Sequence, residues 1–250
     1  MKTILITGCS SGFGLEIAKH FLGRDWKVIA TMRSPRTDVL PTSDRLHVLA
    51  LDVTDPDSIQ RAVETAGPID VLVNNAGVGL TNAVEVLPME KVRGVFETNT
   101  LGTIAMAQAV LPQMRARMAG TIINLSSSTT LEMYPFLAIY TASKAAVNAF
   151  TACLALEVAP FNIGVHLVVP GYSPETPFHS RQEYVNGSMP EVYQKLAQEY
   201  FGGANDVSVF TRPLDVAEAV WRAATDPSCP LRLAAGSDTL ALFEREQISH

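Results

Sequence analysis

The sequence predicts an α/β protein in which helices cover both faces of a doubly wound, parallel β-sheet. Short apolar runs alternate with helical patterns along the 250 residues, and each run is apolar throughout rather than at every second position. Such strands are buried on both faces, as in a parallel sheet between two helix layers. We expect strands near Thr3–Thr7, Lys27–Thr31, Leu46–Leu51, Val71–Asn74, Thr121–Leu125, Gly164–Val169 and Leu231–Ala234.

The first strand leads directly into a glycine-rich turn. The segment Gly8-Cys9-Ser10-Ser11-Gly12-Phe13-Gly14 follows Thr7 with TGxxxGxG spacing, and a helix pattern runs from Leu15 to Leu22. Glycines at these points permit a tight turn and let backbone N–H groups and the positive end of a helix approach a pyrophosphate. The strand, turn and helix therefore predict a dinucleotide site.

The strand near Thr121–Leu125 ends in the hydroxyl-rich run Ser126-Ser127-Ser128. Ligands of open α/β sheets bind at the carboxyl ends of the strands, so a serine here can face a substrate carbonyl. The alternative is a polar cap or turn. Spacing to the next motif selects Ser127, and Ser126 and Ser128 stay as alternatives.

The helix after this strand contains Tyr140-Thr141-Ala142-Ser143-Lys144. Four residues are about one helical turn, so the phenol of Tyr140 and the ammonium of Lys144 share one helix face. A neighbouring positive charge favours the phenolate, which makes Tyr140 a candidate proton donor and acceptor.

The alternation is interrupted between Tyr172 and Arg212, a segment rich in Pro, Gly and aromatic residues. Long insertions at the carboxyl end of a strand commonly cover a site, so we interpret residues 172–212 as a substrate-covering lobe. Aromatic packing within the lobe is the alternative. Residues that would line an apolar pocket are Leu80, Tyr134, Phe136, Phe178, His179, Tyr184, Tyr193, Tyr200, Phe201 and Phe210.

These motifs resemble the short-chain dehydrogenase/reductase family from Lys2 to about Ser237. Further matches are Asn74-Asn75-Ala76-Gly77, Asn99 and Pro170-Gly171. The glycine turn and Ala30-Thr31-Met32-Arg33 look most like the branch that contains 17β-hydroxysteroid and retinol dehydrogenases. The resemblance implies a single Rossmann-type domain over residues 1–250 and reversible hydride transfer between a nicotinamide and an alcohol or carbonyl carbon.

The resemblance also implies a role for each site residue. Tyr140 would exchange a proton with the substrate oxygen, and Ser127 would hydrogen-bond that oxygen. Lys144 would lower the pKa of Tyr140 and bind the nicotinamide ribose, while Asn99 would hold a water of the proton relay. The residues expected to contact the cofactor are Gly8, Ser10, Ser11, Gly12, Phe13, Gly14, Arg33, Asp52, Val53, Asn75, Ala76, Gly77, Tyr140, Lys144, Pro170, Gly171 and Thr176.

Two positions depart from the family pattern. The threonine usually found four residues after the glycine of Pro170-Gly171 is Glu175 here, and Thr176 follows it. The usual Ala-Gly after the catalytic serine is replaced by Thr129-Thr130. Asp52, in turn, starts a segment that also reads as a plain helix entry.

The cofactor form is predicted from the end of the second strand. NAD-dependent members of the family carry an acidic residue where this chain has Met32, and Arg33 follows it. A guanidinium binds a 2′-phosphate, which a carboxylate repels. We expect NADP(H) to be preferred, with NAD(H) possible, and Ser11 to add a hydroxyl donor.

Composition restricts the partners. The net charge is −6 and no run of Lys or Arg occurs, which argues against nucleic acid or an anionic membrane. We expect a small-molecule partner, a homodimer or homotetramer, and a cytoplasmic protein, because the first strand leaves no room for a signal peptide. Three cysteines at wide spacing favour neither disulfides nor a metal site.

Three other functions remain open at this point. A dinucleotide-sensing regulator could keep the fold without turnover, although it would need neither Tyr140 nor Lys144. An NAD-dependent alcohol dehydrogenase would share the site. An epimerase or dehydratase acting on a sugar nucleotide would usually have a longer carboxyl-terminal domain.

Overall fold

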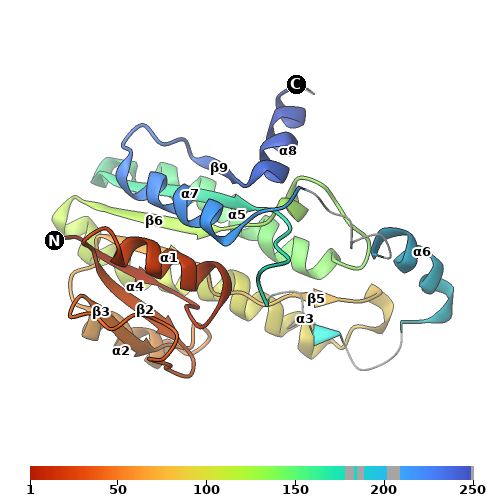
Figure 1. The fold of residues 1–250 in the computed structure, drawn as a ribbon, viewed down its shortest axis with the longest axis horizontal. Helices are drawn as coiled ribbons and strands as arrows, with labels where there is room; N and C mark the ends of the chain where they lie inside the picture. The colour runs from red at the N-terminus through yellow and green to blue at the C-terminus, as the bar shows by residue number, and fades with distance from the viewer. Residues whose placement is uncertain (178–182, 185–188, 202–208, 249–250) are drawn as a thin grey trace.

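A seven-stranded parallel sheet forms the centre of the computed structural model, in the order β3-β2-β1-β4-β6-β7-β9 (Figure 1). Its strands are β1 (Thr3–Ile6), β2 (Lys27–Met32), β3 (Leu46–Ala50), β4 (Val71–Asn74), β6 (Gly120–Leu125), β7 (Ile163–Pro170) and β9 (Arg232–Ala235). All seven expected strands are present, and every pairing among them is parallel. The structure describes residues 1–177, 183–184, 189–201 and 209–248.

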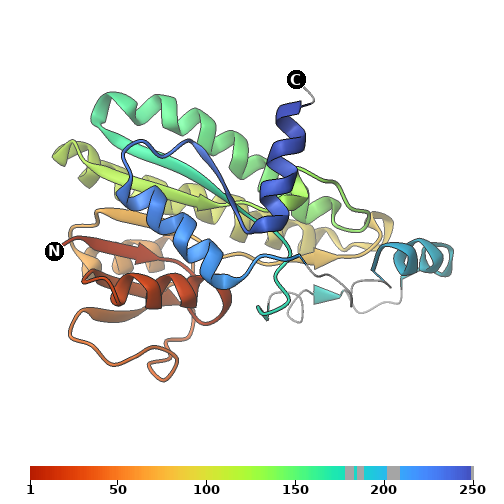
Figure 2. The ribbon, with the colours of Figure 1, turned by 45° about the horizontal axis from the view of Figure 1, so that its top comes forward.

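Helices cover both faces of this sheet. On one face lie α1 (Gly12–Leu22) and α7 (Pro213–Thr225), where Ile17, Phe21 and Val220 pack on apolar residues of β1 and β2. On the other lie α2 (Pro56–Ala66), α4 (Gly102–Arg117) and α5 (Ala138–Val158). The two layers are visible in Figures 1 and 2. This burial on both faces explains why the strands are apolar throughout.

The order of the strands reverses between β1 and β4. The chain moves from β1 to β2 and β3 in one direction, then returns to β4 and continues to β6, β7 and β9 in the other. Crossovers diverge at such a point and leave a crevice at the carboxyl ends of the two central strands. The glycine turn follows β1 and the Asn75-Ala76-Gly77 segment follows β4, so both lie at this crevice.

The remaining elements lie at the carboxyl end of the sheet, except η4 (Ala159–Phe161), which directly precedes β7 at the amino end. Those at the carboxyl end are β5 (Leu80–Thr81), η1 (Val84–Val86), α3 (Met89–Phe96), η2 (Glu97–Leu101), η3 (Ser128–Thr130), β8 (Glu183–Tyr184), α6 (Glu191–Phe201) and α8 (Ser237–Ile248). A short parallel pairing of β5 with β8 joins the expected lobe to the chain after β4. Helix α6 projects from this end in both ribbon views. The β5–β8 pair is not predicted from the sequence.

Candidate active site

The turn between β1 and α1 requires its glycines. Gly8 and Gly12 have positive φ angles of 77° and 59°. A Cβ atom on Gly14 would lie 2.4 Å from Asn75 Nδ2 and 2.5 Å from the Gly8 carbonyl oxygen. No side chain therefore covers the backbone where α1 begins, and the N–H groups at the positive end of the helix dipole can approach a ligand. This cradle fits the pyrophosphate of a dinucleotide.

Thr7 and Asn75 tie the turn to the end of β4. The Thr7 hydroxyl accepts hydrogen bonds from the backbone N–H groups of Asn75 (3.0 Å) and Ala76 (2.9 Å). The Asn75 amide donates to the carbonyl oxygens of Thr7 (2.8 Å) and Gly8 (3.1 Å). Both donor hydrogens of the Asn75 side chain thus support the glycine turn. The sequence motif predicts Asn75 as a cofactor contact but not this supporting role for its side chain.

The four predicted catalytic residues come from three segments and are all buried. Ser127 is the N-cap of η3 just after β6, Asn99 lies in η2, and Tyr140 and Lys144 lie on α5, with exposed fractions between 0% and 9%. Ser127 hydrogen-bonds the side chain of Tyr140. The Lys144 ammonium donates to the Leu125 carbonyl oxygen at 2.9 Å, so the end of β6 anchors both Ser127 and Lys144.

The side chains of Asn99 and Lys144 both lie close to Gly77. A Cβ atom at Gly77 would lie 3.2 Å from Asn99 Oδ1 and 3.6 Å from Lys144 Nζ. Asn99 lies in a π-helical turn between α3 and α4, a feature frequent at functional sites. Its amide bonds the Val78 N–H (2.8 Å), the Val78 carbonyl (2.9 Å) and the Ser143 hydroxyl (3.0 Å). Both donor hydrogens are used within the protein.

Burial dominates the titration of Tyr140 and Lys144. Desolvation raises the pKa of Tyr140 to about 12, and the hydrogen bond from Ser127 partly opposes this rise. Desolvation also lowers the pKa of Lys144 to about 8. The expectation that Lys144 lowers the pKa of Tyr140 is therefore not met in the protein alone. Burial removes hydration from the charged forms of both side chains, so it raises the pKa of the phenol and lowers that of the ammonium.

The loop after β7 is held by a carboxylate and a hydroxyl. Asp238 Oδ2 accepts from the Tyr172 N–H (2.9 Å), and Asp238 Oδ1 accepts from the Thr211 hydroxyl (2.7 Å). The Thr211 oxygen also accepts from the Gly171 N–H at 2.9 Å. A Cβ atom on Gly171 would lie 1.7 Å from Asp238 Oδ2, so a side chain at this position would displace the Asp238 carboxylate. Sequence reasoning missed Asp238 and Thr211.

The same loop reaches the glycine turn through Thr176. A Cβ atom on Gly12 would lie 3.4 Å from Thr176 Cβ and 4.0 Å from Pro177 Cδ. Thr176 is 6% exposed, whereas Glu175 is exposed. The geometry favours Thr176 over Glu175 as the residue that faces the cradle. Nearby, the Ser173 hydroxyl is buried and has no hydrogen-bond partner among the described residues, which suits a site built for a further ligand.

Arg33 and Asp52 lie at the carboxyl ends of β2 and β3, which pair in the sheet. Arg33 is exposed, and its charge helps to lower the pKa of Asp52, although a hydrogen bond from the Thr54 N–H is the larger cause. Met32 is 3% exposed and packs in the core, while Val53 is 8% exposed and fills the space above Gly102. The segment that starts at Asp52 also leads into α2, and the N-cap of this helix is Asp55.

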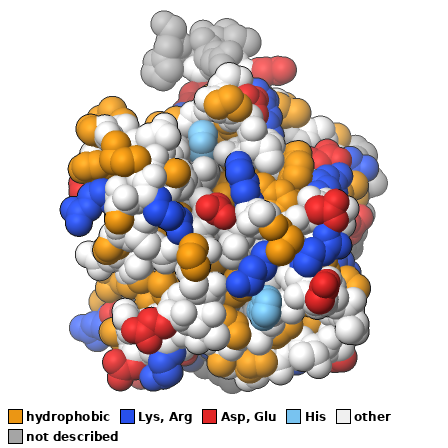
Figure 3. Space-filling view, turned by 90° about the vertical axis from the view of Figure 1, so that its left-hand side faces the viewer, with side chains coloured by type: hydrophobic (Ala, Val, Ile, Leu, Met, Phe, Trp, Pro, Cys, Tyr) orange, Lys and Arg blue, Asp and Glu red, His pale blue; other side chains and the backbone are white. Residues whose placement is uncertain are grey.

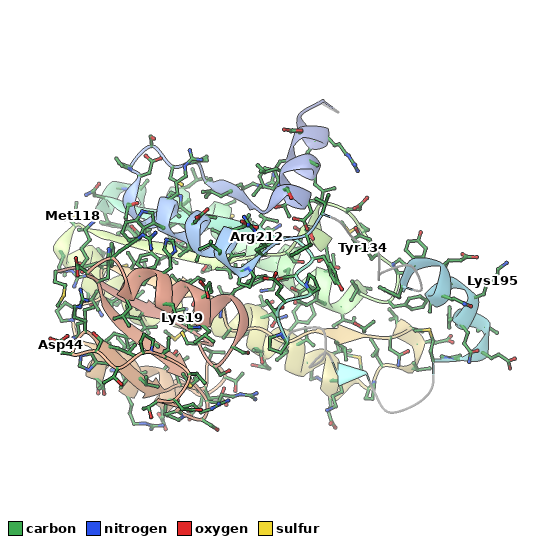
Figure 4. All side chains as sticks on the ribbon, in the orientation of Figure 1. Lys19, Asp44, Met118, Tyr134, Lys195 and Arg212 are labelled. Carbon is green, nitrogen blue, oxygen red and sulfur yellow. The ribbon has the colours of Figure 1, made fainter. Side chains whose placement is uncertain are left out.

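Aromatic residues of the expected lobe contact the loop before α5. The ring of Phe136, 7% exposed, lies 6.0 Å from the ring of Tyr193 and 6.2 Å from that of Phe201. Leu80 is also buried, while Tyr134 and Tyr200 are 36% and 53% exposed. Figure 4 places Tyr134 near α6, at the end of the molecule opposite Met118. Phe178 and His179 lie outside the described residues, as does the side chain of Tyr184.

Other features lie away from these residues. An open groove of about 760 Å³ lies between α7, β9 and α8, where Phe210 is one of its lining residues. None of the predicted catalytic residues lines it. Within the part of the chain that the structure describes, no group of three or more His, Cys, Asp or Glu side chains is arranged to hold a metal. Burial raises the pKa of Cys9 to about 12, which makes it a poor nucleophile.

One described segment, Ala138–Phe161, is long and apolar enough to span a membrane on length and composition alone, and 28% of its most apolar window is buried. Buried helices of soluble proteins pass the same test. This segment contains Tyr140 and Lys144, and α5 packs on β7. On the face shown in Figure 3, Lys and Arg side chains are interspersed with Asp and Glu.

Comparison with known proteins agrees with this geometry. A family model described as short chain dehydrogenase matches residues 2–184. An uncharacterized oxidoreductase of Bacillus subtilis and a 3-ketodihydrosphingosine reductase of Bacteroides thetaiotaomicron are both 42% identical to the chain; each alignment covers 68% of this chain, and they cover 64% and 63% of those proteins. Retinol dehydrogenase 8 of Bos taurus is 35% identical, over 92% of this chain and 80% of its own.

Solved structures share the whole fold. A short-chain dehydrogenase from Streptomyces avermitilis superposes with a TM-score of 0.84 at 33% identity, over 99% of this chain and 92% of the other. A serine dehydrogenase complexed with NADP⁺ gives a TM-score of 0.81 at 29% identity, over 95% of each chain. A 3-ketoacyl-(acyl-carrier-protein) reductase from Brucella melitensis complexed with NADH gives 0.77 at 26% identity, over 94% and 97%.

Proposed function

The chain belongs to the short-chain dehydrogenase family of oxidoreductases, and from this premise we propose that it interconverts an apolar or aromatic ketone or aldehyde and the corresponding alcohol with NADP(H). The observation that carries the proposal is the hydrogen bond between the buried hydroxyls of Ser127 and Tyr140, with Lys144 and Asn99 both packed around Gly77. A site that only sensed a dinucleotide would need no proton donor.

A nicotinamide cofactor supplies the hydride when reduced and accepts it when oxidised. The chain fits such a group: Gly8, Gly12 and Gly14 form the cradle, Thr176 faces it, and Ser173 has an unsatisfied hydroxyl. In the direction of reduction, the C=O π bond breaks, the carbon takes the hydride with its two electrons, and the oxygen takes the proton of Tyr140. Tyr140 is left as a phenolate, while Ser127 stabilises the charge on the oxygen and keeps its own hydrogen.

Lys144 supports the phenolate form of Tyr140 in this scheme. An ammonium on the same helix face favours the phenolate by Coulomb attraction. The high pKa of Tyr140 in the protein alone means that this attraction must be strengthened in the complete site. An oxidised nicotinamide carries a positive charge that acts in the same direction. Asn99, fixed to Val78 and Ser143, holds the π-helical turn beside Lys144.

The preference for NADP(H) rests on Arg33. It is an exposed cation at the carboxyl end of β2, and the neighbouring Met32 is buried in the core. One solved neighbour is complexed with NADP⁺ and another with NADH, so the family supports either form. A guanidinium at this place offers charge-assisted hydrogen bonds to a 2′-phosphate, and Asp52 partly neutralises it.

The apolar character of the substrate rests on the loop before α5 and on α6. Phe136 contacts Tyr193 and Phe201 there, and these contacts join aromatic rings. Two relatives are named for retinol and for 3-ketodihydrosphingosine, compounds with long hydrocarbon parts. We propose a soluble cytoplasmic homo-oligomer as the working form.

The direct test is a panel of neutral aromatic and aliphatic ketones and alcohols, assayed by absorbance of the reduced cofactor with NADPH and with NADH. Tyr140→Phe should lose about 10²- to 10⁴-fold in kcat while its affinity for the cofactor is unchanged. Arg33→Ala should lose about 10- to 100-fold in kcat/KM with NADPH and little with NADH. Arg33 is the suitable position because an acidic residue at Met32 would be buried.

Three results would contradict the proposal. Tight cofactor binding without turnover on any carbonyl or alcohol would favour the sensing regulator. A wild-type kcat/KM that favours NADH would overturn the assignment to Arg33. A clear preference for short carboxylated or phosphorylated ketones would overturn the substrate class.

A further inference from the structure

The hydroxyl of Ser127 is held by the residue two positions later. Ser127 Oγ accepts a hydrogen bond from the Thr129 backbone N–H at 3.2 Å and another from the Thr129 hydroxyl at 3.1 Å. Both residues are buried, with 9% and 8% of their surfaces exposed. Thr129 is also one of the two residues that depart from the family pattern, because Ala-Gly is usual after the catalytic serine. The chain therefore adds a hydroxyl beside Ser127.

Counting donors and acceptors fixes the direction of the remaining bond. A hydroxyl oxygen has two lone pairs and one hydrogen. Thr129 occupies both lone pairs of Ser127, one through its N–H and one through its O–H. Ser127 can then meet Tyr140 only as the donor. The hydrogen bond from Ser127 accordingly favours the phenolate of Tyr140.

We propose that Thr129 is a positioning residue that commits Ser127 to donate its hydrogen toward the reacting oxygen. The inference rests on the proposed function and adds a residue to it. Without the Thr129 hydroxyl, one lone pair of Ser127 is free to accept from Tyr140. That alternative removes a hydrogen from the substrate oxygen and leaves the tyrosine paired within the protein.

The surrounding loop remains fixed when the Thr129 hydroxyl is removed. The Thr130 hydroxyl donates to the Ser127 carbonyl oxygen at 2.8 Å, and the Asn148 amide donates to the Thr130 hydroxyl at 3.0 Å. The Ser126 hydroxyl bonds to Asn148 Oδ1. Three contacts to α5 and η3 thus hold the Ser126–Thr130 backbone independently of Thr129. Thr129→Val keeps the shape and the N–H bond and removes one hydroxyl.

The experiment compares Thr129→Val, Thr129→Ser and a matched control. The control is Thr141→Val, because the Thr141 hydroxyl is buried beside Tyr140 but has no hydrogen-bond partner among the described residues. We expect Thr129→Val to lower kcat about 3- to 10-fold, the effect of one neutral hydrogen bond, with the KM for the cofactor unchanged. Thr129→Ser should recover most of the rate, and Thr141→Val should match the wild type.

A second readout needs neither cofactor nor turnover. The tyrosinate absorbance of each protein is titrated, and the curve of the matching Tyr140→Phe variant is subtracted to isolate Tyr140. The pKa of Tyr140 should be higher in Thr129→Val than in the wild type, because Ser127 no longer donates to the phenolate in every molecule. Thr129→Ser should restore it.

Several outcomes would overturn the inference. One is a Thr129→Val variant whose kcat and Tyr140 titration equal those of the wild type. Another is an equal loss of kcat in Thr129→Val and Thr141→Val. The third is a Thr129→Ser variant whose kcat is as low as that of Thr129→Val, which would assign the effect to the methyl group. Failure of the proposed function is a separate result, because it appears as an inactive wild type while the titration still reports the bond between Ser127 and Tyr140.

Discussion

Lys144→Met should stabilise the protein near neutral pH, although it removes a residue of the site. Lys144 is 5% exposed, and its ammonium donates a hydrogen bond to the Leu125 carbonyl oxygen. Burial lowers the pKa of Lys144 from 10.5 to about 8. The fold therefore carries the free-energy cost of holding a buried cation, and methionine fills a similar volume without a charge.

The size of the effect follows from the pKa. At about 1.4 kcal/mol per pKa unit, the shift of Lys144 corresponds to roughly 3 kcal/mol of lost stability below the folded pKa. Lys144→Met also loses the charged hydrogen bond to Leu125, which lowers the stability of the variant by about 1.5 to 3 kcal/mol. The net gain for Lys144→Met near neutral pH is then up to about 2 kcal/mol. For a chain of this size each kcal/mol changes Tm by about 2 to 4 °C.

The dependence on pH gives the sharper test. Below about pH 8 both the folded and the unfolded chain hold the proton of Lys144, so the whole cost is present. Between pH 8 and 10.5 the unfolded chain holds this proton and the folded chain has released it, so the wild type gains stability as pH rises. The difference between Lys144→Met and wild type should therefore fall by roughly 2 kcal/mol from about pH 7 to about pH 9.5.

Urea unfolding of both proteins across this range measures the difference, and other titrating groups cancel in it. Lys195→Met is the control, because Lys195 lies on the projecting helix α6 with 89% of its side chain exposed (Figure 4). It should show no dependence of this kind. A difference between Lys144→Met and wild type that is independent of pH, or that grows as pH rises, would refute the reasoning.

Three further predictions test the cradle and the loop after β7. Gly14→Ala should lower Tm and weaken cofactor binding at least about tenfold, because its Cβ meets Asn75 and Gly8, whereas Gly94→Ala, with nothing within 4 Å of its Cβ, should gain about 0.5 to 1 kcal/mol of stability. Both are read by thermal unfolding and cofactor titration, and equal behaviour of the two would contradict the clash. Asp238→Ala should lower the free energy of unfolding by about 2 to 4 kcal/mol, and Asp238→Asn should lower it much less, since the amide can still accept from Tyr172 and donate to Thr211. Equal decreases in the two variants would show that these hydrogen bonds are unimportant. Ser173→Ala should leave Tm unchanged or higher but weaken cofactor binding, and a lower Tm would mean that its hydroxyl has a partner in the protein.

The sheet could be predicted from the sequence because each of its strands is buried on both faces. The runs at Val71–Asn74 and Thr121–Leu125 pair in the centre of the sheet, where helices cover both faces, and their side chains are therefore mostly apolar. The β5–β8 pair carries no such signal, since each strand is two residues long. The π-helical turn that contains Asn99 was equally hidden, because a five-residue change of helix type leaves the apolar pattern of α3 and α4 intact.

The candidate site was predictable where spacing carries the information and not where contacts do. TGxxxGxG marks backbone positions, and a Cβ at Gly14 indeed has no space. Asp238 lies 67 residues after Gly171 in the chain, and no local pattern connects its carboxylate to the Gly171 Cα. Thr129 was noticed only as a departure from the family pattern. Its hydrogen bonds to Ser127 depend on the local fold of η3, which a three-residue segment does not reveal.

The position of Tyr140 and Lys144 connects stability with chemistry. Both lie on the buried face of α5. Burial favours the neutral form of each side chain, because it raises the pKa of Tyr140 to about 12 and lowers the pKa of Lys144 to about 8. Water would remove both pKa shifts and would also weaken every hydrogen bond to a charge that develops on a substrate oxygen. The same burial that makes Lys144 destabilising therefore places Ser127 and Tyr140 in a low-dielectric site. It follows that substitutions which admit water near α5 should reduce the destabilisation caused by Lys144 and also lower the rate. Thr129→Val admits no water, so it should change the rate and the pKa of Tyr140 and leave the cost of burying Lys144 unchanged.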